Sequence, residues 1–434
     1  LAGNLAQEST VLYISPLKAL SNDIEKNLRI PLDGIARELA ARGTPLSSPI
    51  EVMVRTGDTT PAERARMMKQ KPHIIVTTPE SFYVMLTSER GRSMLSTVDT
   101  LIVDEIHAIV SSRRGSHLAL SIERLAALTR KPLQRIGISA TVKPLDRVAE
   151  FLGAKKEVRI LDEGHNRPMD VKMITPDVAL DAVMTQEGWA QIHEKLIELM
   201  KSARTTLIFV NNRRLCERLA RQLSDLIGQD LVGAHHGSLA HDRRRNAEQA
   251  LKAGTLKVMV ATSSLELGID IGSVDLVVQI ASPRSIHGFL QRIGRAEHHK
   301  DGVSRAVLVP LTRDDLVECA ALLRAIKQGK LEEIEIPQAP LDILAQQLVA
   351  ELACRSMTAD QAFDLVRSAN PYKTLERNKF EQILEMLSDG YSLRFGRRSR
   401  YVFYDRALGT LPGEALASVR SPMAERLQII LNTK

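Results

Sequence analysis

The stretch Leu101-Ile102-Val103-Asp104-Glu105-Ile106-His107 says most about the fold and the chemistry of this chain. Its apolar run is typical of a buried strand in a parallel sheet, and two acids and a histidine follow at the carboxyl end of that strand. In open α/β sheets this end faces the ligand crevice. The first acid can hold Mg²⁺, directly or through water, and the second can position or polarise an attacking water. Taken alone, the stretch fits nucleotide hydrolysis and a strand that ends in solvated charge equally well.

Composition sets broad limits on the rest of the chain. With 434 residues, 44% of them hydrophobic and 26% charged, the chain is long enough for two to four globular domains. The net charge of +7 suits a polyanionic partner such as nucleic acid without requiring one. The three cysteines are too scattered for a zinc site or a disulfide framework, so we expect no structural metal and a reducing, cytoplasmic setting. No apolar run reaches the roughly 18 residues that span a bilayer, so we expect no membrane association.

Alternating strands and helices predict two α/β domains in tandem, each a parallel sheet wrapped by helices. In the first domain we expect strands at 11–14, 51–54, 73–77, 101–104 and 135–138, and helices at 18–28, 61–70, 79–87, 116–129 and 144–152. In the second we expect strands at 206–210, 231–234, 258–261, 276–280 and 305–309, and helices at 189–202, 212–227 and 241–253. The segment 162–177 is interpreted as a linker that contains a short strand.

After residue 340 the pattern becomes mostly helical, with helices expected at 341–354, 358–368 and 374–388. Two strands, 391–395 and 401–404, are expected to flank a turn at Gly396-Arg397-Arg398, which suggests a winged-helix module. Aromatic residues interleaved with arginines in 391–404 could stack on single-stranded DNA, although aromatics that pack on the wing's own helices are the preferred interpretation. The expected domains are 1–162, 163–335 and 336–408, with 409–434 as the start of a further region or an irregular tail.

Two more polar groups follow predicted strands. Ser139-Ala140-Thr141 comes after the strand at 135–138, where two hydroxyls can bond the acids of the first site, or can simply satisfy turn backbone. In the second domain, a strand ends in Thr262 and Ser263, which could contact a nucleic-acid phosphate. Beyond them Gly268 permits a tight bend that presents Asp270, which could contact the ribose of a nucleotide.

The run Gln291-Arg292-Ile293-Gly294-Arg295 places two arginines three residues apart, on one face of a helical turn. Guanidinium groups suit phosphate oxygens, and arginines of this kind can neutralise charge that develops on a γ-phosphate. The alternative is a solvated basic helix start. Other basic or histidine-rich runs are weaker signals: we interpret Arg113-Arg114 and Arg243-Arg244-Arg245 as solvated faces, and His235, His236 and His241 as a hydrogen-bonded or DNA-facing loop rather than a metal site.

These sites resemble, in order, the motifs of superfamily 2 helicases. The stretch 16–20 is similar to motif Ia of that group, 77–80 to motif Ib, 104–107 to motif II and 139–141 to motif III. The stretch 209–212 resembles motif IV, 261–270 motif V and 291–295 motif VI. His235-His236-Gly237-Ser238-Leu239, together with Arg-Ala-x-His at 295–298, is similar more narrowly to the large helicase-related (Lhr) family.

The resemblance covers residues 1 to about 408. It implies two RecA-like domains followed by a winged helix, with ATP and Mg²⁺ as cofactors and 3′-to-5′ translocation on single-stranded DNA that unwinds duplexes or DNA–RNA hybrids. DNA repair is the expected setting. By likeness, Asp104 would hold Mg²⁺ and Glu105 would activate water, while His107, Ser139 and Thr141 would couple the nucleotide to the strand. Arg292 and Arg295 would act as arginine fingers from the second domain, with Gln291 beside them as a further catalytic residue of motif VI. The DNA backbone would be contacted by Lys18, Thr78, Thr262 and Ser263.

Two departures from the family pattern matter. The 434 residues contain no G-x-x-x-x-G-K-[ST] loop, whose backbone N–H groups and lysine cradle the β- and γ-phosphates. We therefore expect a truncated chain that does not turn over ATP by itself. A nucleic-acid-binding remnant without catalysis, or a translocase that does not separate strands, remains the alternative. Glu297, where the family usually has glycine, could pair with Arg295, but an exposed glutamate on a helix flank is the preferred interpretation.

Overall fold

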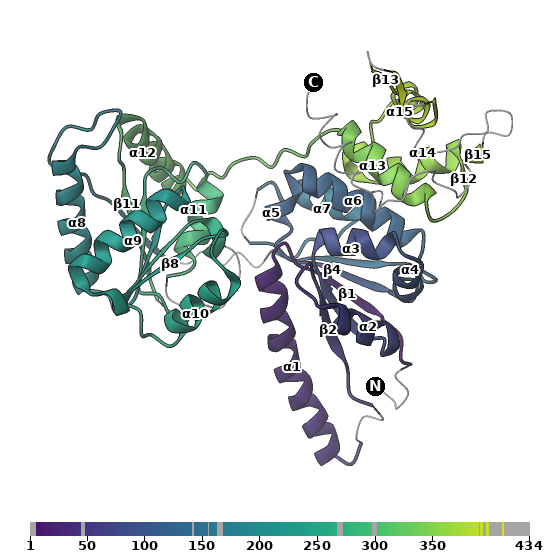
Figure 1. The fold of residues 1–434 in the computed structure, drawn as a ribbon, viewed down its shortest axis with the longest axis horizontal. Helices are drawn as coiled ribbons and strands as arrows, with labels where there is room; N and C mark the ends of the chain where they lie inside the picture. The colour runs from purple at the N-terminus through teal and green to yellow at the C-terminus, as the bar shows by residue number, and fades with distance from the viewer. Residues whose placement is uncertain are drawn as a thin grey trace. The chain divides into compact units, whose positions relative to one another are not determined.

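The computed structural model describes residues 6–44, 48–140, 143–154, 156–162, 168–266, 272–296, 302–389, 391–393, 396–398 and 410–411. The chain forms two compact units (Figure 1). The first unit comprises Leu1–Leu161 and Ile334–Lys434, and the second comprises Asp162–Glu333. Both contain a parallel sheet covered by helices, so the predicted α/β class with two tandem parallel-sheet domains is confirmed.

The sheet of the first unit has five parallel strands in the order β2-β3-β1-β4-β5. Its strands begin and end within one residue of the predicted positions. They are β1 (Val11–Ile14), β2 (Val52–Arg55), β3 (Ile74–Thr77), β4 (Thr100–Val103) and β5 (Gln134–Gly137). The helices are α1 (Lys18–Ala41), α2 (Pro61–Lys69), α3 (Pro79–Leu86), α4 (Glu89–Leu95), α5 (His107–Val110), α6 (Arg113–Ala126) and α7 (Leu145–Gly153).

Helix α1 differs most from its prediction, because it continues to Ala41 instead of ending at residue 28. Pro31 lies inside it and removes one backbone hydrogen bond. This half of the helix is largely exposed, so water can satisfy the carbonyl that Pro31 leaves without a donor. Helix α4 lies between α3 and β4, in a stretch where no helix was predicted; the N-cap Ser88, whose hydroxyl accepts the N–H of Gly91, begins it.

The far edge of β5 has no neighbouring strand among the described residues. Strands of parallel sheets are usually buried on both faces. In β5, however, Ile136 is 38% exposed and Ile138, which follows the strand, is 45% exposed. These are side chains that a further strand or another covering element would bury.

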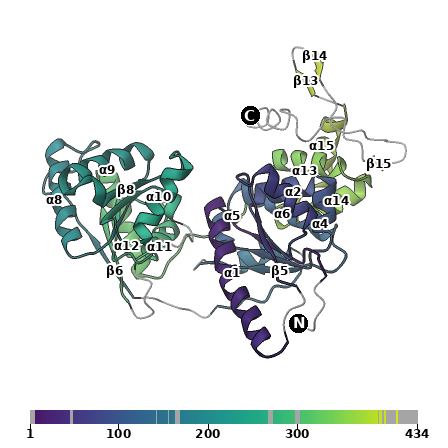
Figure 2. The ribbon, with the colours of Figure 1, turned by 60° about the horizontal axis from the view of Figure 1, so that its bottom comes forward.

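The helical region after residue 340 packs on the first sheet's helices (Figures 1 and 2). Helices α13 (Leu341–Leu352) and α14 (Ala359–Arg367) lie against α6, and one hydrophobic core contains residues of both parts, among them Leu118 and Leu344. Helix α15 (Arg377–Asp389) packs on α13. The three helices predicted here are therefore confirmed, and the structure unites them with the first sheet in one unit.

The hairpin after α15 differs from its prediction. Strand β13 (Tyr391–Leu393) pairs antiparallel with β14 (Gly396–Arg398), and Leu393 is opposite Gly396. The predicted turn at Gly396-Arg397-Arg398 is therefore wrong, because these residues form the second strand. Because they pair with Tyr391–Leu393 in the antiparallel ladder, they cannot also form its turn. The predicted strand at 401–404 lies outside the described residues.

The second unit has a six-stranded parallel sheet in the order β6-β11-β10-β7-β9-β8. Its strands are β6 (Met169–Met173), β7 (Thr206–Phe209), β8 (Val232–His235), β9 (Val258–Ala261), β10 (Leu276–Ile280) and β11 (Ser304–Val309). Its helices are α8 (Gln186–Lys201), α9 (Arg213–Ile227), α10 (His241–Lys252), α11 (Ile286–Ile293) and α12 (Arg313–Lys327). The predicted linker strand is β6, which extends the sheet at one edge by pairing with β11.

Candidate active site and nucleic-acid interface

Asp104 and Glu105 follow β4 at the carboxyl edge of the first sheet, where the sequence predicted them. The N–H of Asp104 donates to the carbonyl oxygen of Ile14 at 2.9 Å, and the Asp104 Oδ1 accepts the N–H of Glu105 at 2.9 Å. Glu105 has a φ of +46°, a left-handed conformation that non-glycine residues adopt at a cost. The sharp bend turns two partly exposed carboxylates out at the end of a buried strand.

His107 connects the second of these acids to the end of the next strand. Its Nδ1 accepts the backbone N–H of Ala140 at 3.2 Å and lies 3.1 Å from the Ser139 Oγ. Because an N–H can only donate, Nδ1 carries no proton and the proton sits on Nε2. Nε2 lies 3.3 Å from the Glu105 Oε2, so the buried ring can donate to that carboxylate. One histidine thus joins the polar groups that follow β4 and β5.

Tyr13, which the sequence reading missed, also faces this edge. Its hydroxyl hydrogen-bonds Asp104, and burial together with the charges of Asp104 and Glu105 raises its pKa well above the ordinary value. The phenol therefore stays protonated and donates to the carboxylate. Strand register could have revealed it, because Tyr13 is opposite Ile102 and the side chains of residues 102 and 104 share one face of the strand.

Mg²⁺ binds through one or two carboxylates, waters and substrate phosphates, and the Asp104 carboxylate at the sheet's edge fits this ligand set. Among the described residues no three His, Cys, Asp or Glu side chains gather as they would in an all-protein metal site. The chemistry of the donor groups therefore suits a cation that is shared with a bound phosphate, rather than a structural metal.

Arg114 joins the two stretches that were expected to contact DNA from the first unit. Its guanidinium donates to the carbonyl oxygen of Pro16 at 2.8 Å and, through Nε and Nη2, to the Glu80 carboxylate at 2.5 and 3.0 Å. Although burial would raise the pKa of Glu80, the hydrogen bonds and charge of Arg114 hold it below its usual value. Arg113 pairs with Asp342 of α13 at 2.8 Å. Arg113 is exposed and Arg114 partly exposed, as expected for a solvated face, and each in addition pairs with a carboxylate.

Thr78 is buried and acts as the N-cap of α3. Its Oγ1 accepts the N–H of Ser81, and Pro79 occupies the first helical turn, as is common at such a start. The threonine side chain thus already has a structural partner. Lys18 is the first residue of α1, and the placement of its side chain lies outside what the structure describes.

In the second unit, the loop after β9 brings the predicted hydroxyls to the carboxyl edge of the sheet. Thr262 is partly exposed and Ser263 is exposed. The N–H of Thr262 donates to the carbonyl oxygen of His235, the last residue of β8, at 3.1 Å. Ser264, which the sequence reading did not single out, lies 2.7 Å from the His235 Nδ1.

The two arginines of the 291–295 run have different surroundings. Arg292 is buried: it makes two hydrogen bonds to the Glu266 carboxylate, at 2.8 and 3.1 Å, and one to the Gln279 Oε1, and it stacks on Phe209. Arg295 is partly exposed and donates to the carbonyl oxygen of Glu266 at 2.9 Å. Gln291 is partly exposed at the end of α11. Glu266 therefore holds both arginines, a role that no local sequence pattern revealed.

Four predicted positions cannot be compared with the structure. Thr141, Gly268, Asp270 and Glu297 lie outside the described residues. His236 bonds the Glu217 Oε1 at 2.6 Å and accepts the N–H of Ser238, as expected for a hydrogen-bonded loop.

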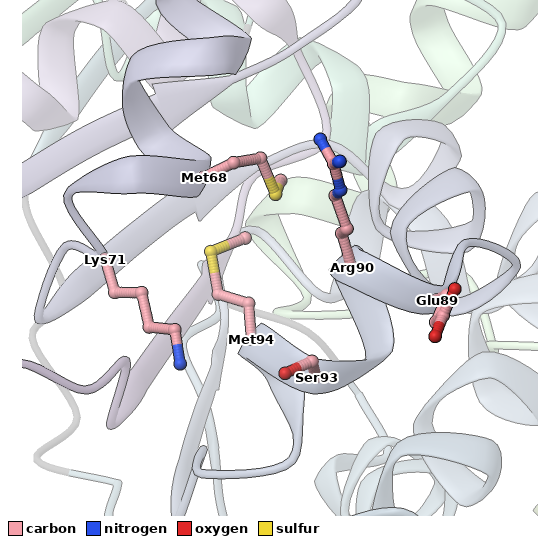
Figure 3. Close-up of a pocket in the computed structure, with 6 residues that line it drawn as sticks. All are labelled: Met68, Lys71, Glu89, Arg90, Ser93 and Met94. Carbon is pink, nitrogen blue, oxygen red and sulfur yellow. The ribbon is translucent and has the colours of Figure 1, made fainter.

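A surface pocket of the first unit lies away from these residues (Figure 3). Met68 and Met94 point into it from α2 and α4, and Lys71, Glu89, Arg90 and Ser93 complete its lining. Lys71 precedes β3 and Met94 precedes β4, so the pocket lies toward the amino ends of these strands, opposite the edge that carries Asp104. In the part of the chain that the structure describes, no helix has the length and apolarity that crossing a membrane requires.

Three family models match successive parts of the chain. Residues 2–149 match the DEAD/DEAH box helicase family, and residues 191–300 match the helicase conserved C-terminal domain. Residues 324–427 match the winged helix domain of large helicase-related proteins. The order of the three agrees with the motif order in the sequence.

Curated relatives and solved structures agree. The chain is 40% identical to the Lhr helicase/probable uracil glycosylase of Mycolicibacterium smegmatis, over 98% of this chain and 30% of that protein. It is 39% identical to the ATP-dependent helicase Lhr-Core of Saccharolobus solfataricus, over 94% of this chain and 49% of that protein. The chain thus spans between about a third and half of these relatives' length.

A solved structure of the Mycobacterium smegmatis helicase Lhr bound to single-stranded DNA and AMP-PNP superposes with a TM-score of 0.86 and 42% identity. It covers 97% of this chain and 54% of that chain. The helicase MrfA bound to DNA, at 23% identity and a TM-score of 0.69, shares the fold. With three family models in order and Lhr relatives along nearly its whole length, the chain belongs to the large helicase-related (Lhr) family of superfamily 2 ATP-dependent helicases.

Proposed function

We propose that this chain is the motor core of an ATP-dependent helicase or translocase that moves 3′-to-5′ on single-stranded DNA and unwinds duplexes or DNA–RNA hybrids. The observation that carries the proposal is the contact of His107 with Glu105 on one side and with Ser139 and Ala140 on the other. A ring that joins a water-activating carboxylate to the neighbouring strand end is suited to coupling nucleotide state to strand binding. The Lhr structure from Mycobacterium smegmatis contains single-stranded DNA and AMP-PNP, which supports the proposal that this chain binds DNA and ATP.

In the proposed reaction, Asp104 would hold Mg²⁺, and Glu105 would orient the attacking water and take its proton. When bound, Mg²⁺ would neutralise negative charge on the phosphate oxygens. His107, with its proton on Nε2, donates to the Glu105 carboxylate and so fixes its orientation. Tyr13 does the same for Asp104. Both acids are therefore oriented by neutral hydrogen-bond donors.

We assign different roles to the arginines of the second unit. Arg295, which is partly exposed, is proposed to act on the γ-phosphate as an arginine finger, and Gln291 to assist it. Arg292 was expected to be a second finger, but its burial against Glu266 and Gln279 favours a positioning role. Gly268 and Asp270 are proposed to contact the nucleotide, and Thr141 to act with Ser139.

The nucleic acid is proposed to lie along the hydroxyls of Thr262 and Ser263 and along Lys18. Thr78 is proposed to lie along the same nucleic-acid strand, but its hydroxyl already caps α3 by accepting the N–H of Ser81. The scattered cysteines support a reducing, cytoplasmic setting. DNA repair remains the expected pathway.

We also propose that these 434 residues alone do not turn over ATP. No P-loop motif, whose backbone N–H groups and lysine cradle the phosphates, occurs in the 434 residues. The exposed isoleucines at the β5 edge support a further strand there, as a P-loop-bearing segment would supply. The missing loop is also what favours the second candidate, a DNA-binding protein without catalysis.

The coupling by His107 can be tested in a longer chain that carries a P-loop segment before residue 1. In it, Ser139→Ala should keep most of the ATP hydrolysis that occurs without DNA but lose most of the stimulation by single-stranded DNA, because the hydroxyl contacts His107. Ser93→Ala, at the opposite edge of the sheet, is the matched control and should behave as the unmodified protein. Full stimulation in Ser139→Ala would contradict the coupling. DNA binding without any hydrolysis would favour the second candidate.

A further inference from the structure

His235, the last residue of β8, is buried and uses both ring nitrogens. Its Nδ1 lies 2.7 Å from the Ser264 Oγ, and its Nε2 lies 2.8 Å from the Glu248 Oε1. Glu248 comes from α10, and Ser264 comes from the single turn Ser263–Leu265 that follows β9. The ring therefore ties a helix to the loop that presents the exposed hydroxyls.

The backbone of His235 holds the same loop. Its carbonyl oxygen accepts the N–H of Thr262 at 3.1 Å and the hydroxyl of Ser264 at 3.2 Å. His235 and Ala261 are partners in the parallel β8–β9 ladder, so the Thr262 bond continues that ladder past the ends of both strands. Thr262 Oγ1 in turn lies 3.5 Å from Ser264 Oγ. Side chain and backbone of one residue thus fix a three-residue segment.

The neighbouring histidine provides a contrast. His236 is bonded to Glu217 of α9, whose side chain is 56% exposed, and it accepts the N–H of Ser238 in its own loop. Among the described residues, neither His236 nor Glu217 makes a hydrogen bond or ion pair with residues 262–264. Two adjacent histidines with glutamate partners therefore differ in whether they reach the loop after β9.

We propose that His235 is a positioning residue for nucleic-acid binding, which holds Thr262 and Ser263 in place for the phosphates of a single strand. The inference rests on the proposed function, since it takes these two hydroxyls as the contact. Glu248 fixes the ring, the ring and the carbonyl oxygen of His235 fix the Ser264 side chain, and the same carbonyl oxygen fixes the backbone of Thr262. A hydroxyl held in place before binding loses less conformational freedom on binding than a mobile one.

The two ring contacts can be separated by substitution. Because a carboxylate only accepts hydrogen bonds, Nε2 donates to Glu248, and Nδ1 is the ring atom that contacts the Ser264 hydroxyl. The amide of asparagine can reach about as far as Nδ1, and the amide of glutamine about as far as Nε2. In His235→Asn the contact with Ser264 can survive without Glu248, whereas in His235→Gln the contact with Glu248 can survive without Ser264.

The experiment measures the dissociation constant of this chain for a fluorescein-labelled oligothymidylate by anisotropy, over a range of salt concentrations. A single hydrogen bond is worth roughly two- to tenfold in an equilibrium constant. We expect His235→Ala, His235→Gln and Ser264→Ala to weaken binding about fivefold or more, with His235→Asn restoring most of the affinity. Glu217→Gln is the matched control and should change the affinity less than about twofold, because Glu217 hydrogen-bonds His236 and not His235.

The salt dependence distinguishes the loss of a neutral hydroxyl contact from the loss of a charged contact. Each phosphate that a lysine or arginine neutralises adds about 0.7 to the slope of log affinity against log salt for a single strand, so His235→Gln should weaken binding at every salt concentration without changing that slope. Thermal unfolding followed by the fluorescence of Trp189, which belongs to the same unit, checks that each variant is folded. Equal affinity in folded His235→Gln and in the unmodified chain, or a slope lowered by a whole charged contact, would overturn the proposal. If the unmodified chain does not bind the oligonucleotide at all, the proposed function fails instead.

Discussion

Replacing Glu351 by glutamine should destabilise the first unit of this protein and leave the second unit unchanged. Glu351 of α13 is 2% exposed and receives three arginines: Arg124 of α6 at 2.6 Å, Arg92 of α4 at 3.3 Å and Arg355 at 2.5 Å. Burial alone would raise the pKa of Glu351, but the charge and hydrogen bond of Arg124, with Arg355 and Arg92, hold it below its usual value. The carboxylate is thus the only negative charge in these ion pairs.

The size of the effect follows from the burial of Arg124, which is as deeply buried as Glu351. Removing one partner of a buried ion pair leaves an uncompensated charge and costs about 3–5 kcal/mol. Arg124 would keep its bond to the Gln347 Oε1 at 2.8 Å, which supplies no opposite charge. For a unit of this size, 1 kcal/mol corresponds to a midpoint shift of roughly 2–4 °C, so the first unit should melt on the order of 10 °C lower.

The position of the single tryptophan makes the assay selective. Trp189 lies in α8 of the second unit, so its fluorescence, excited at 295 nm, reports the unfolding of that unit alone. Far-UV circular dichroism reports the helices of both units. In Glu351→Gln, thermal unfolding should show an early transition by circular dichroism, whereas the tryptophan transition stays where it is in the unmodified chain.

Glu381→Gln provides the matched control. Glu381 pairs with Arg377 on α15 of the same unit, but its side chain is 56% exposed, and exposed pairs contribute about 0–1 kcal/mol. A shift of less than about 1 kcal/mol in Glu351→Gln, or one no larger than that of Glu381→Gln, would refute the reasoning. So would an equal shift of the tryptophan transition.

Two further predictions follow from buried titratable groups. Burial lowers the pKa of His117 to about 4, so the folded first unit keeps the ring neutral while the unfolded chain protonates it near pH 6.5; stability should be complete above pH 6.5 and fall by roughly 3 kcal/mol toward pH 4. Unfolding followed by circular dichroism at several pH values checks this, and an unchanged pH dependence in His117→Gln would contradict it. Burial raises the pKa of Cys216 to about 11 and that of Cys319 to about 12, so at pH 8 iodoacetamide should modify the partly exposed Cys354 first, as followed by mass spectrometry. Alkylation of Cys216 as fast as that of an unfolded control would be the contrary result.

The strands were predictable because each is a short apolar run between polar or turn-forming residues. In the second sheet β7, β9 and β10 are buried along their whole length, so their sequences are almost purely apolar and their ends are sharp. Helix α1 was less predictable, because Pro31 favours an early end in sequence terms, whereas the exposed helix tolerates it. Local patterns also gave no indication that α13 would bury Glu351 against α6, since the two helices are more than 200 residues apart.

The residues of the candidate site likewise differ in how far the sequence could predict their surroundings. Asp104, Glu105 and His107 were identified because they directly follow a recognisable strand, and their placement depends on that strand alone. Arg292 has the same residue type and spacing as an exposed arginine finger, and its contacts with Glu266, Gln279 and Phe209, all distant in sequence, determine that it is buried. Ser264 lies in the stretch that resembles motif V but was not expected to have a role, and Glu248 lies in no motif. Both contact His235, and these contacts follow from the fold of the second sheet.

ATP hydrolysis with and without single-stranded DNA tests the central claim most directly, when it is measured both on this chain and on the same chain extended by a P-loop-bearing segment before residue 1. The account predicts no hydrolysis by the 434 residues alone, DNA-stimulated hydrolysis by the extended chain, and its loss in the extended Glu105→Gln variant. Hydrolysis that survives Glu105→Gln, or that ignores DNA, would contradict the account. Silence of the extended chain with DNA bound would show a nucleic-acid-binding protein rather than a motor.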